Sequence, residues 1–160
     1  MNEKYNLTLK DRILFFPCLN DKLILEQKEN IDYQVNNYRS VGIFSSKSLK
    51  WNLAKGFFFL HIITGILIYF KLIDIDYMAL GFSFLLYFVL FIFILKGNKI
   101  SIVLLGLSIV ANYLLSVEEI SNNVKLEGGG ITSTVPLTFI TWYFLSMTYQ
   151  IYIIERDKKI

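Results

Sequence analysis

The sequence predicts an all-α integral membrane protein built as a four-transmembrane-helix bundle. The first observation is composition: 54% of the 160 residues are hydrophobic and 18% are charged, against about 45–50% and about 25% in soluble domains. The second is that the apolar residues gather in long runs after residue 55. The third is that almost all Lys and Arg residues lie before the first run, between the second and third runs, or after the fourth. One Cys and two Pro also exclude a disulfide scaffold and a collagen.

Four apolar segments meet or approach the length of a membrane span. A bilayer core about 30 Å thick needs roughly 20 apolar residues in a helix that rises 1.5 Å per residue. We expect spans at about 56–73, 77–95, 100–117 and 134–154, the last three without any charge. Four buried helices in a soluble domain would leave too little polar chain to cover them. The chain therefore divides into an N-terminal segment, 1–50, and a transmembrane domain, 51–160.

The positions of the basic residues predict the orientation of these spans. Lys and Arg are enriched in the cytoplasmic loops of helical membrane proteins. Fourteen of the sixteen lie before the first span, between the second and third, or after the fourth. The two opposite loops contain only Lys71 and Lys125. We therefore expect a multi-pass protein of the cell inner (plasma) membrane with both termini in the cytoplasm and a long outer loop at about 118–133.

The first fifty residues predict a small cytoplasmic element. Leu9, Ile13 and Phe16 share one face of an amphipathic helix that Pro17 should end. Apolar and polar residues then alternate over 31–36, which predicts a short strand, with another possible strand at 41–44. Strands this few are marginal alone, so the segment should dock on the membrane helices or on a partner.

The only histidine, His61, lies about five residues inside the first span. An ionisable residue at membrane depth is by default a functional hypothesis, and the alternative is a His that only hydrogen-bonds within the bundle. In antiparallel spans, Gln150 and Tyr87 match its depth better than Asn112 does. We therefore predict an intramembrane polar cluster of His61, Tyr87 and Gln150.

Small and polar residues also form a stripe on the third and fourth spans. Such residues let helices pack closely and bond to carbonyls or across helices, or they line a polar pathway. The members of this polar stripe are Ser101, Ser108, Asn112, Thr138, Thr141 and Thr148.

No motif predicts catalysis. A metal site needs several ligands, whereas the chain has one His and one distant Cys. The glycine run 128–130 lacks the Lys-Ser/Thr of a phosphate-binding loop, and no basic and aromatic run indicates nucleic-acid binding. We expect no enzyme activity, no cofactor, no metal and no nucleic-acid partner.

Three classes of function fit these expectations. The first is a small non-enzymatic bacterial membrane protein that acts through protein–protein interaction, of immunity, phage-defence or accessory-subunit type, whose partners are the lipid bilayer and another protein or a second copy. The first alternative is an oligomeric channel or transporter whose pathway the Ser/Thr stripe lines. The second alternative is a membrane redox subunit that uses His61.

Overall fold

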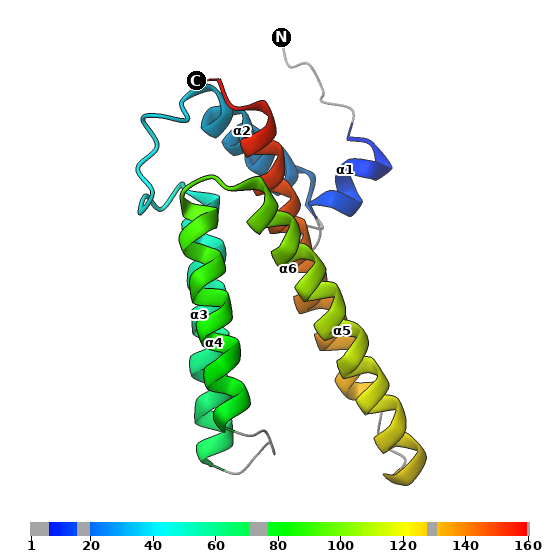
Figure 1. Ribbon diagram of the computed structural model, residues 1–160. Helices are drawn as coiled ribbons and strands as arrows, with labels where there is room; N and C mark the ends of the chain where they lie inside the picture. Colours follow the sequence, from blue (N-terminus) through cyan, green and yellow to red (C-terminus); the bar gives the residue numbers. More distant parts are fainter. Residues whose placement is uncertain (1–6, 16–19, 71–76, 128–130, 160) are drawn as a thin grey trace.

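The computed structural model describes residues 7–15, 20–70, 77–127 and 131–159, and within these ranges the chain is all-helical. Two short helices precede four long ones (Figure 1). The helices are α1 (Leu9–Leu14), α2 (Asp21–Asn36), α3 (Leu49–Tyr69), α4 (Tyr77–Leu95), α5 (Lys99–Glu127) and α6 (Ile131–Asp157).

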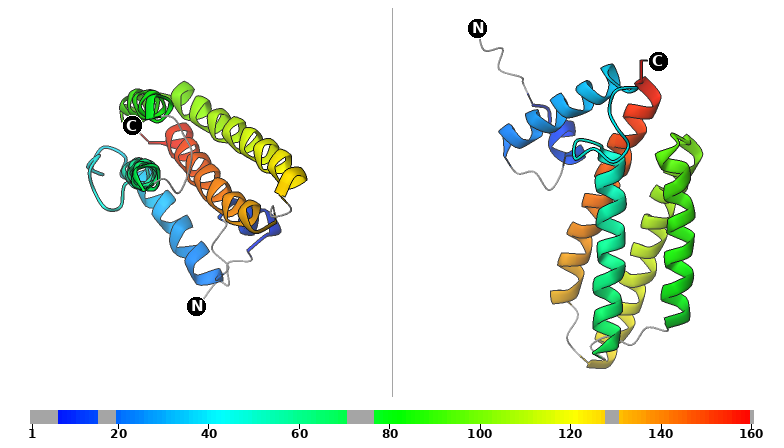
Figure 2. Two further views of the ribbon diagram at one scale, coloured as in Figure 1. Left: turned by 90° about the horizontal axis from the view of Figure 1, so that it is seen from below. Right: turned by 90° about the vertical axis from the view of Figure 1, so that its left-hand side faces the viewer.

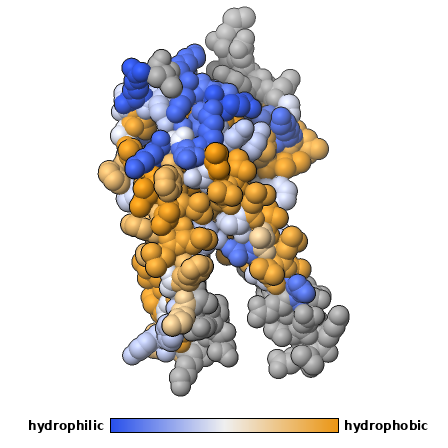
Figure 3. Space-filling model, in the orientation of Figure 1, coloured by the Kyte–Doolittle hydropathy of each residue, from blue (hydrophilic) through white to orange (hydrophobic). Residues whose placement is uncertain are grey.

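Among the residues that the structure describes, three helices are long and apolar enough to cross a membrane: α3, the Lys99–Glu118 part of α5, and the Leu137–Asp157 part of α6. The apolar stretch Leu80–Leu95 of α4 is shorter. On the face that Figure 3 shows, apolar side chains predominate along the long helices, and hydrophilic side chains gather at the end where the C-terminus lies. The helical membrane-type architecture expected from the sequence is thus confirmed.

The long helices form two pairs, α3 with α4 and α5 with α6, and α3 also contacts α6 while α4 contacts α5. The pairs converge at the end where the C-terminus lies and diverge towards the other end (Figures 1 and 2). The converging end contains the aromatic core. The Phe57 ring packs against Phe144, Tyr87 and Phe91, with centroids 4.4, 5.0 and 5.4 Å apart. These contacts tie α3, α4 and α6 together.

The predicted strands are wrong, because residues 21–36 form the single helix α2. The Asn20 side chain caps this helix by accepting a hydrogen bond from the backbone N–H of Lys22 at 2.9 Å. Ile24 and Ile31 are buried, and Val35 is partly buried against the core. Their spacing of seven and four residues follows one helical face, which outweighs the short polar alternation. Residues 41–44 also lie in turns and bends rather than in a strand.

The expected helix near the N-terminus is present as α1. Thr8 and Asp11 form a capping box at its start. Leu9 and Ile13 are 74% and 46% exposed, so this face does not pack on the bundle, whereas Phe15 is buried. Phe16 and Pro17 lie outside the described residues. Together α1, α2 and residues 37–48 make a cap at the converging end of the long helices, in which α1 lies beside α6 and contacts Trp142 and Ser146 (Figure 2).

The long loop expected at 118–133 is helical for most of its length, so this expectation is wrong. α5 continues to Glu127 and α6 begins at Ile131. The polar residues after 117 mark where the apolar stretch stops, but they contain no Pro or Gly before 128 to interrupt a helix.

Candidate functional site

His61 lies between α3 and α4, with both ring nitrogens engaged. Nδ1 is 2.9 Å from the Phe57 carbonyl oxygen, and because a carbonyl only accepts, Nδ1 donates. Nε2 is 3.2 Å from the Ser83 hydroxyl oxygen, so in the neutral ring the hydroxyl donates to Nε2. The edge of the imidazole also packs on the Tyr87 ring, with centroids 5.6 Å apart.

Tyr87 extends this contact to α5. Its hydroxyl oxygen accepts a hydrogen bond from the Asn112 side-chain amide at 2.6 Å, and its ring is 5% exposed. Tyr87 therefore links His61 on α3 with Asn112 on α5. From their depths along the spans, Asn112 is expected to lie further from His61 than Tyr87 and Gln150 do. That expectation uses backbone positions alone, whereas the long tyrosine side chain reaches Asn112.

Gln150 lies apart from His61, in the packing between α6 and α2. Its side chain is 3% exposed and donates to the Ser146 hydroxyl at 3.1 Å and to the Gln27 side-chain oxygen at 3.4 Å. The Ser146 hydroxyl in turn donates to the Leu14 carbonyl at the end of α1. Gln150 thus joins the cap to α6, whereas His61 and Tyr87 lie within the bundle.

The polar stripe divides into residues with different local roles. Ser108 and Thr148 donate to carbonyls of their own helices, Leu105 at 2.8 Å and Phe144 at 2.7 Å. Thr138 pairs with the Tyr113 hydroxyl at 3.1 Å. Of the other three, Asn112 donates to the Tyr87 hydroxyl, Ser101 is buried and Thr141 is half-buried. Within the described ranges, every buried side-chain nitrogen and oxygen atom has a hydrogen-bond partner.

Sequence reasoning missed a charged cluster at the converging end, which we call the Glu155 cluster: Tyr38, Lys50, Glu155 and Lys158. The Glu155 side chain has no exposed surface and forms ion pairs with Lys50 and with Lys158, the latter at 3.0 Å. The Tyr38 hydroxyl donates to it at 2.6 Å. Both ammonium groups also lie over the Tyr38 ring, 5.0 and 4.5 Å from its centroid.

The Glu155 cluster fixes the cap to the long helices, because its members come from the 37–48 segment, the first turn of α3 and the end of α6. Burial and the hydrogen bond to Glu155 raise the pKa of Tyr38 well above its usual range. Gly97, between α4 and α5, has φ +81° and faces the same group: an added Cβ would lie 2.7 Å from the Glu155 Oε2 atom. In the sequence, the only sign of this cluster is that the acidic residue Glu155 lies between the apolar run of the last span and the basic C-terminal residues.

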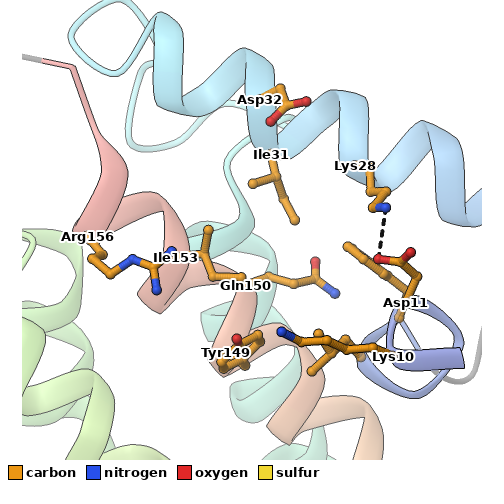
Figure 4. A pocket seen from close by; sticks show the side chains of 11 residues that line it. Lys10, Asp11, Lys28, Ile31, Asp32, Tyr149, Gln150, Ile153 and Arg156 are labelled. Carbon is orange, nitrogen blue, oxygen red and sulfur yellow. Dashed lines mark ion pairs between the residues drawn. The ribbon is translucent and has the colours of Figure 1, made fainter. Parts of the chain in front are cut away.

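A second feature that the sequence did not predict is a cavity of about 450 Å³ where α1, α2 and α6 meet. Charged side chains from all three helices surround it (Figure 4). Lys28 and Asp11 form an ion pair across it at 2.8 Å. The Lys28 hydrogen bond, together with one from the Thr8 backbone, lowers the pKa of Asp11 to about 2.

Among the described residues, no three His, Cys, Asp or Glu side chains lie close enough together to hold a metal ion. Comparison with protein-family models, with curated proteins and with solved structures found no match to this chain.

Proposed function

We propose that the protein is a four-span membrane protein, with both termini in the cytoplasm, that acts through protein–protein interaction rather than by catalysis. The observation that carries the proposal is the cap, a folded polar element built onto the ends of the long helices by the Glu155 cluster. In this topology the cap faces the cytoplasm and presents a surface whose position relative to the membrane is fixed. A partner that docks there would be held at the inner face of the membrane.

The polar groups inside the long helices support this choice over the alternatives. Both His61 ring nitrogens already have partners within the chain, so a haem iron would have to displace one of them. Ser108 and Thr148 satisfy their hydroxyls on their own helices, as packing residues do. Both arrangements favour helix packing over redox chemistry or a polar pathway.

The α2 face turned away from the bundle is the proposed docking surface. Glu26, Glu29 and Asp32 are exposed along it, and they give it an acidic character that a basic surface of a partner would complement. A photo-reactive amino acid at Glu29 in native membranes should give a stoichiometric cross-link to one protein. The same probe at Phe82, 74% exposed on α4, should cross-link lipid.

Charge reversal gives the matched test of the cross-link. Glu26→Lys with Asp32→Lys should abolish it, while Lys22→Glu, on the same helix, should not. A cross-link that survives the double reversal, or one that joins only copies of this chain, would contradict the proposal.

The orientation is tested separately by labelling single cysteines in a Cys18→Ser background. Ser40→Cys lies on the cap, and Gly129→Cys follows the last residue of α5, Glu127, in the sequence. A membrane-impermeant maleimide added to intact cells should label Gly129→Cys and reach Ser40→Cys only after the cells are opened. The reverse pattern would place the cap outside.

The oligomeric channel remains the second candidate, because Asn112 and Thr138 are exposed on the long helices. It predicts that Thr138→Val with Thr141→Val changes ion flux in proteoliposomes of the purified protein. Unchanged flux, or no flux in the parent protein, would remove this candidate.

A further inference from the structure

The cavity between α1, α2 and α6 has the size and the lining of a ligand site. Its volume of about 450 Å³ falls within the usual range for small-molecule pockets, about 300–1,000 Å³. Apolar side chains make up part of the wall, and titratable and amide groups make up the rest. The apolar members are Leu14, Phe15, Ile31 and Ile153.

The charges around the cavity are only partly matched. Lys28 is paired with Asp11, which also caps α1 through Thr8. Arg156 gives Nε and one terminal nitrogen to Asp157, at 2.7 Å each, and this leaves its second terminal nitrogen. Lys10 forms no ion pair within the described part of the chain.

The unmatched donors lie along the α6 wall of the cavity. The Lys10 side chain extends from α1 towards Tyr149, and Arg156 lies further along α6, beside Ile153 (Figure 4). Asp32 lies on the α2 wall (Figure 4). An ammonium, a guanidinium nitrogen and a phenol hydroxyl together form a set of donors that suits the oxygens of a phosphate group.

The surroundings of the cavity favour a lipid as the source of that phosphate. The cavity opens beside the last turns of α6, within the Leu137–Asp157 membrane-spanning candidate. The neighbouring helix α1 exposes Leu9 and Ile13 next to its basic residues Lys10 and Arg12, the pattern of a helix at the membrane interface. If a lipid phosphate binds to Lys10, Arg156 and Tyr149, its acyl chains can lie beside the exposed side chains of Leu9 and Ile13.

We propose that this cavity binds the phosphate group of a membrane phospholipid. Lys10 and Arg156 contact the phosphate oxygens, and the apolar wall contacts the glycerol and the first part of the acyl chains. Asp32 belongs both to the α2 docking surface and to the wall of this cavity, but the phosphate donors Lys10 and Arg156 come from α1 and α6, so the lipid site does not depend on the docking partner.

Native mass spectrometry of the full chain in dodecyl maltoside tests the site directly. The protein is titrated with phosphatidylglycerol and, separately, with diacylglycerol, which has the same chains but no phosphate. Lys10→Gln with Arg156→Gln removes both positive charges without touching the core. Lys22→Gln with Lys55→Gln, at exposed positions outside the cavity, removes the same charge and is the matched control.

The parent protein and the control should retain phosphatidylglycerol well above diacylglycerol. The Lys10/Arg156 variant should lose at least about tenfold of this affinity, since two charge-assisted hydrogen bonds are removed. Equal retention of the two lipids, or equal affinity in the variant and the control, would overturn the proposal.

A second arm distinguishes a lipid from a soluble phosphate compound. Glycerol phosphate, which carries the headgroup chemistry without chains, should not displace phosphatidylglycerol at equal concentration. Displacement at equal concentration would overturn the lipid source and assign the cavity to a soluble phosphate ester.

Discussion

Removing the Lys50 ammonium should free the cap from the long helices. In the Lys50→Met variant, Glu155 keeps its charge with no exposed surface, while Lys158 remains as its cation at 3.0 Å. Breaking a buried ion pair by removing one partner costs about 3–5 kcal/mol. The remaining Lys158 reduces that cost to about 2–3 kcal/mol, which is about 30- to 140-fold in the docking equilibrium of the cap.

Native-state hydrogen exchange in lipid nanodiscs measures this equilibrium through the amides of α2. In Lys50→Met, the protection of the α2 amides from exchange should fall by about 30- to 140-fold. Lys55→Met, on the same helix but exposed, should change protection by no more than about 0.5 kcal/mol. Lys50→Met with Glu155→Met should recover most of the loss, because an apolar pair often replaces a buried ion pair at little cost.

Two results would refute the role given to the Glu155 cluster. One is protection of α2 within about twofold of the parent in Lys50→Met. The other is a double variant less protected than either single variant, since a pair that acts as a unit must show coupling between its members.

Three further predictions concern the same end of the molecule. Because the folded pKa of Tyr38 is raised, its contribution is complete below its ordinary pKa of about 10 and is lost as pH rises from there towards the raised value. The protection of α2 should therefore fall in strong alkali, and Tyr38→Phe should reduce this fall. Because the pKa of Asp11 is lowered to about 2, its contribution is complete above its ordinary pKa of about 4 and is lost as pH falls to 2. The fluorescence of Trp142, whose indole N–H donates to the Ile13 carbonyl at 3.0 Å, should report this loosening of α1 in a Trp51→Phe background, and an unchanged spectrum to pH 2 would contradict it. Gly97→Ala should lower the melting temperature through about 1–2 kcal/mol of left-handed strain and the contact with Glu155, while Gly81→Ala, with open space around it, should raise it slightly.

The long helices were predictable because length and hydropathy act locally. A run such as 77–95 needs no knowledge of its neighbours to be assigned as an apolar helix, and α4 has these bounds. The start of α3 was not predictable in this way. Its helix begins at Leu49, where Ser48 accepts a hydrogen bond from the Trp51 backbone, while the polar residues Lys50, Asn52 and Lys55 had excluded the first turns from the span.

The charged end of the molecule was not predictable, because its contacts join distant parts of the chain. Tyr38 and Glu155 are 117 residues apart, and nothing in the local sequence of either residue indicates the other as its partner. The pattern in 31–36 illustrates the opposite problem: alternation over six residues resembles a strand, but the buried positions Ile24 and Ile31 repeat at helical spacing over a longer window.

The Glu155 cluster also sets the order in which the protein can be assembled. During synthesis the N-terminal parts of a chain emerge first, so α2 and the start of α3 exist long before the end of α6. Until then Lys50 and Tyr38 lack their acidic partner, and the Val35 carbonyl lacks the Lys159 backbone N–H that it accepts at 3.1 Å. The contacts that fix the cap to the long helices therefore form late in biogenesis, once the last helix has been made and inserted.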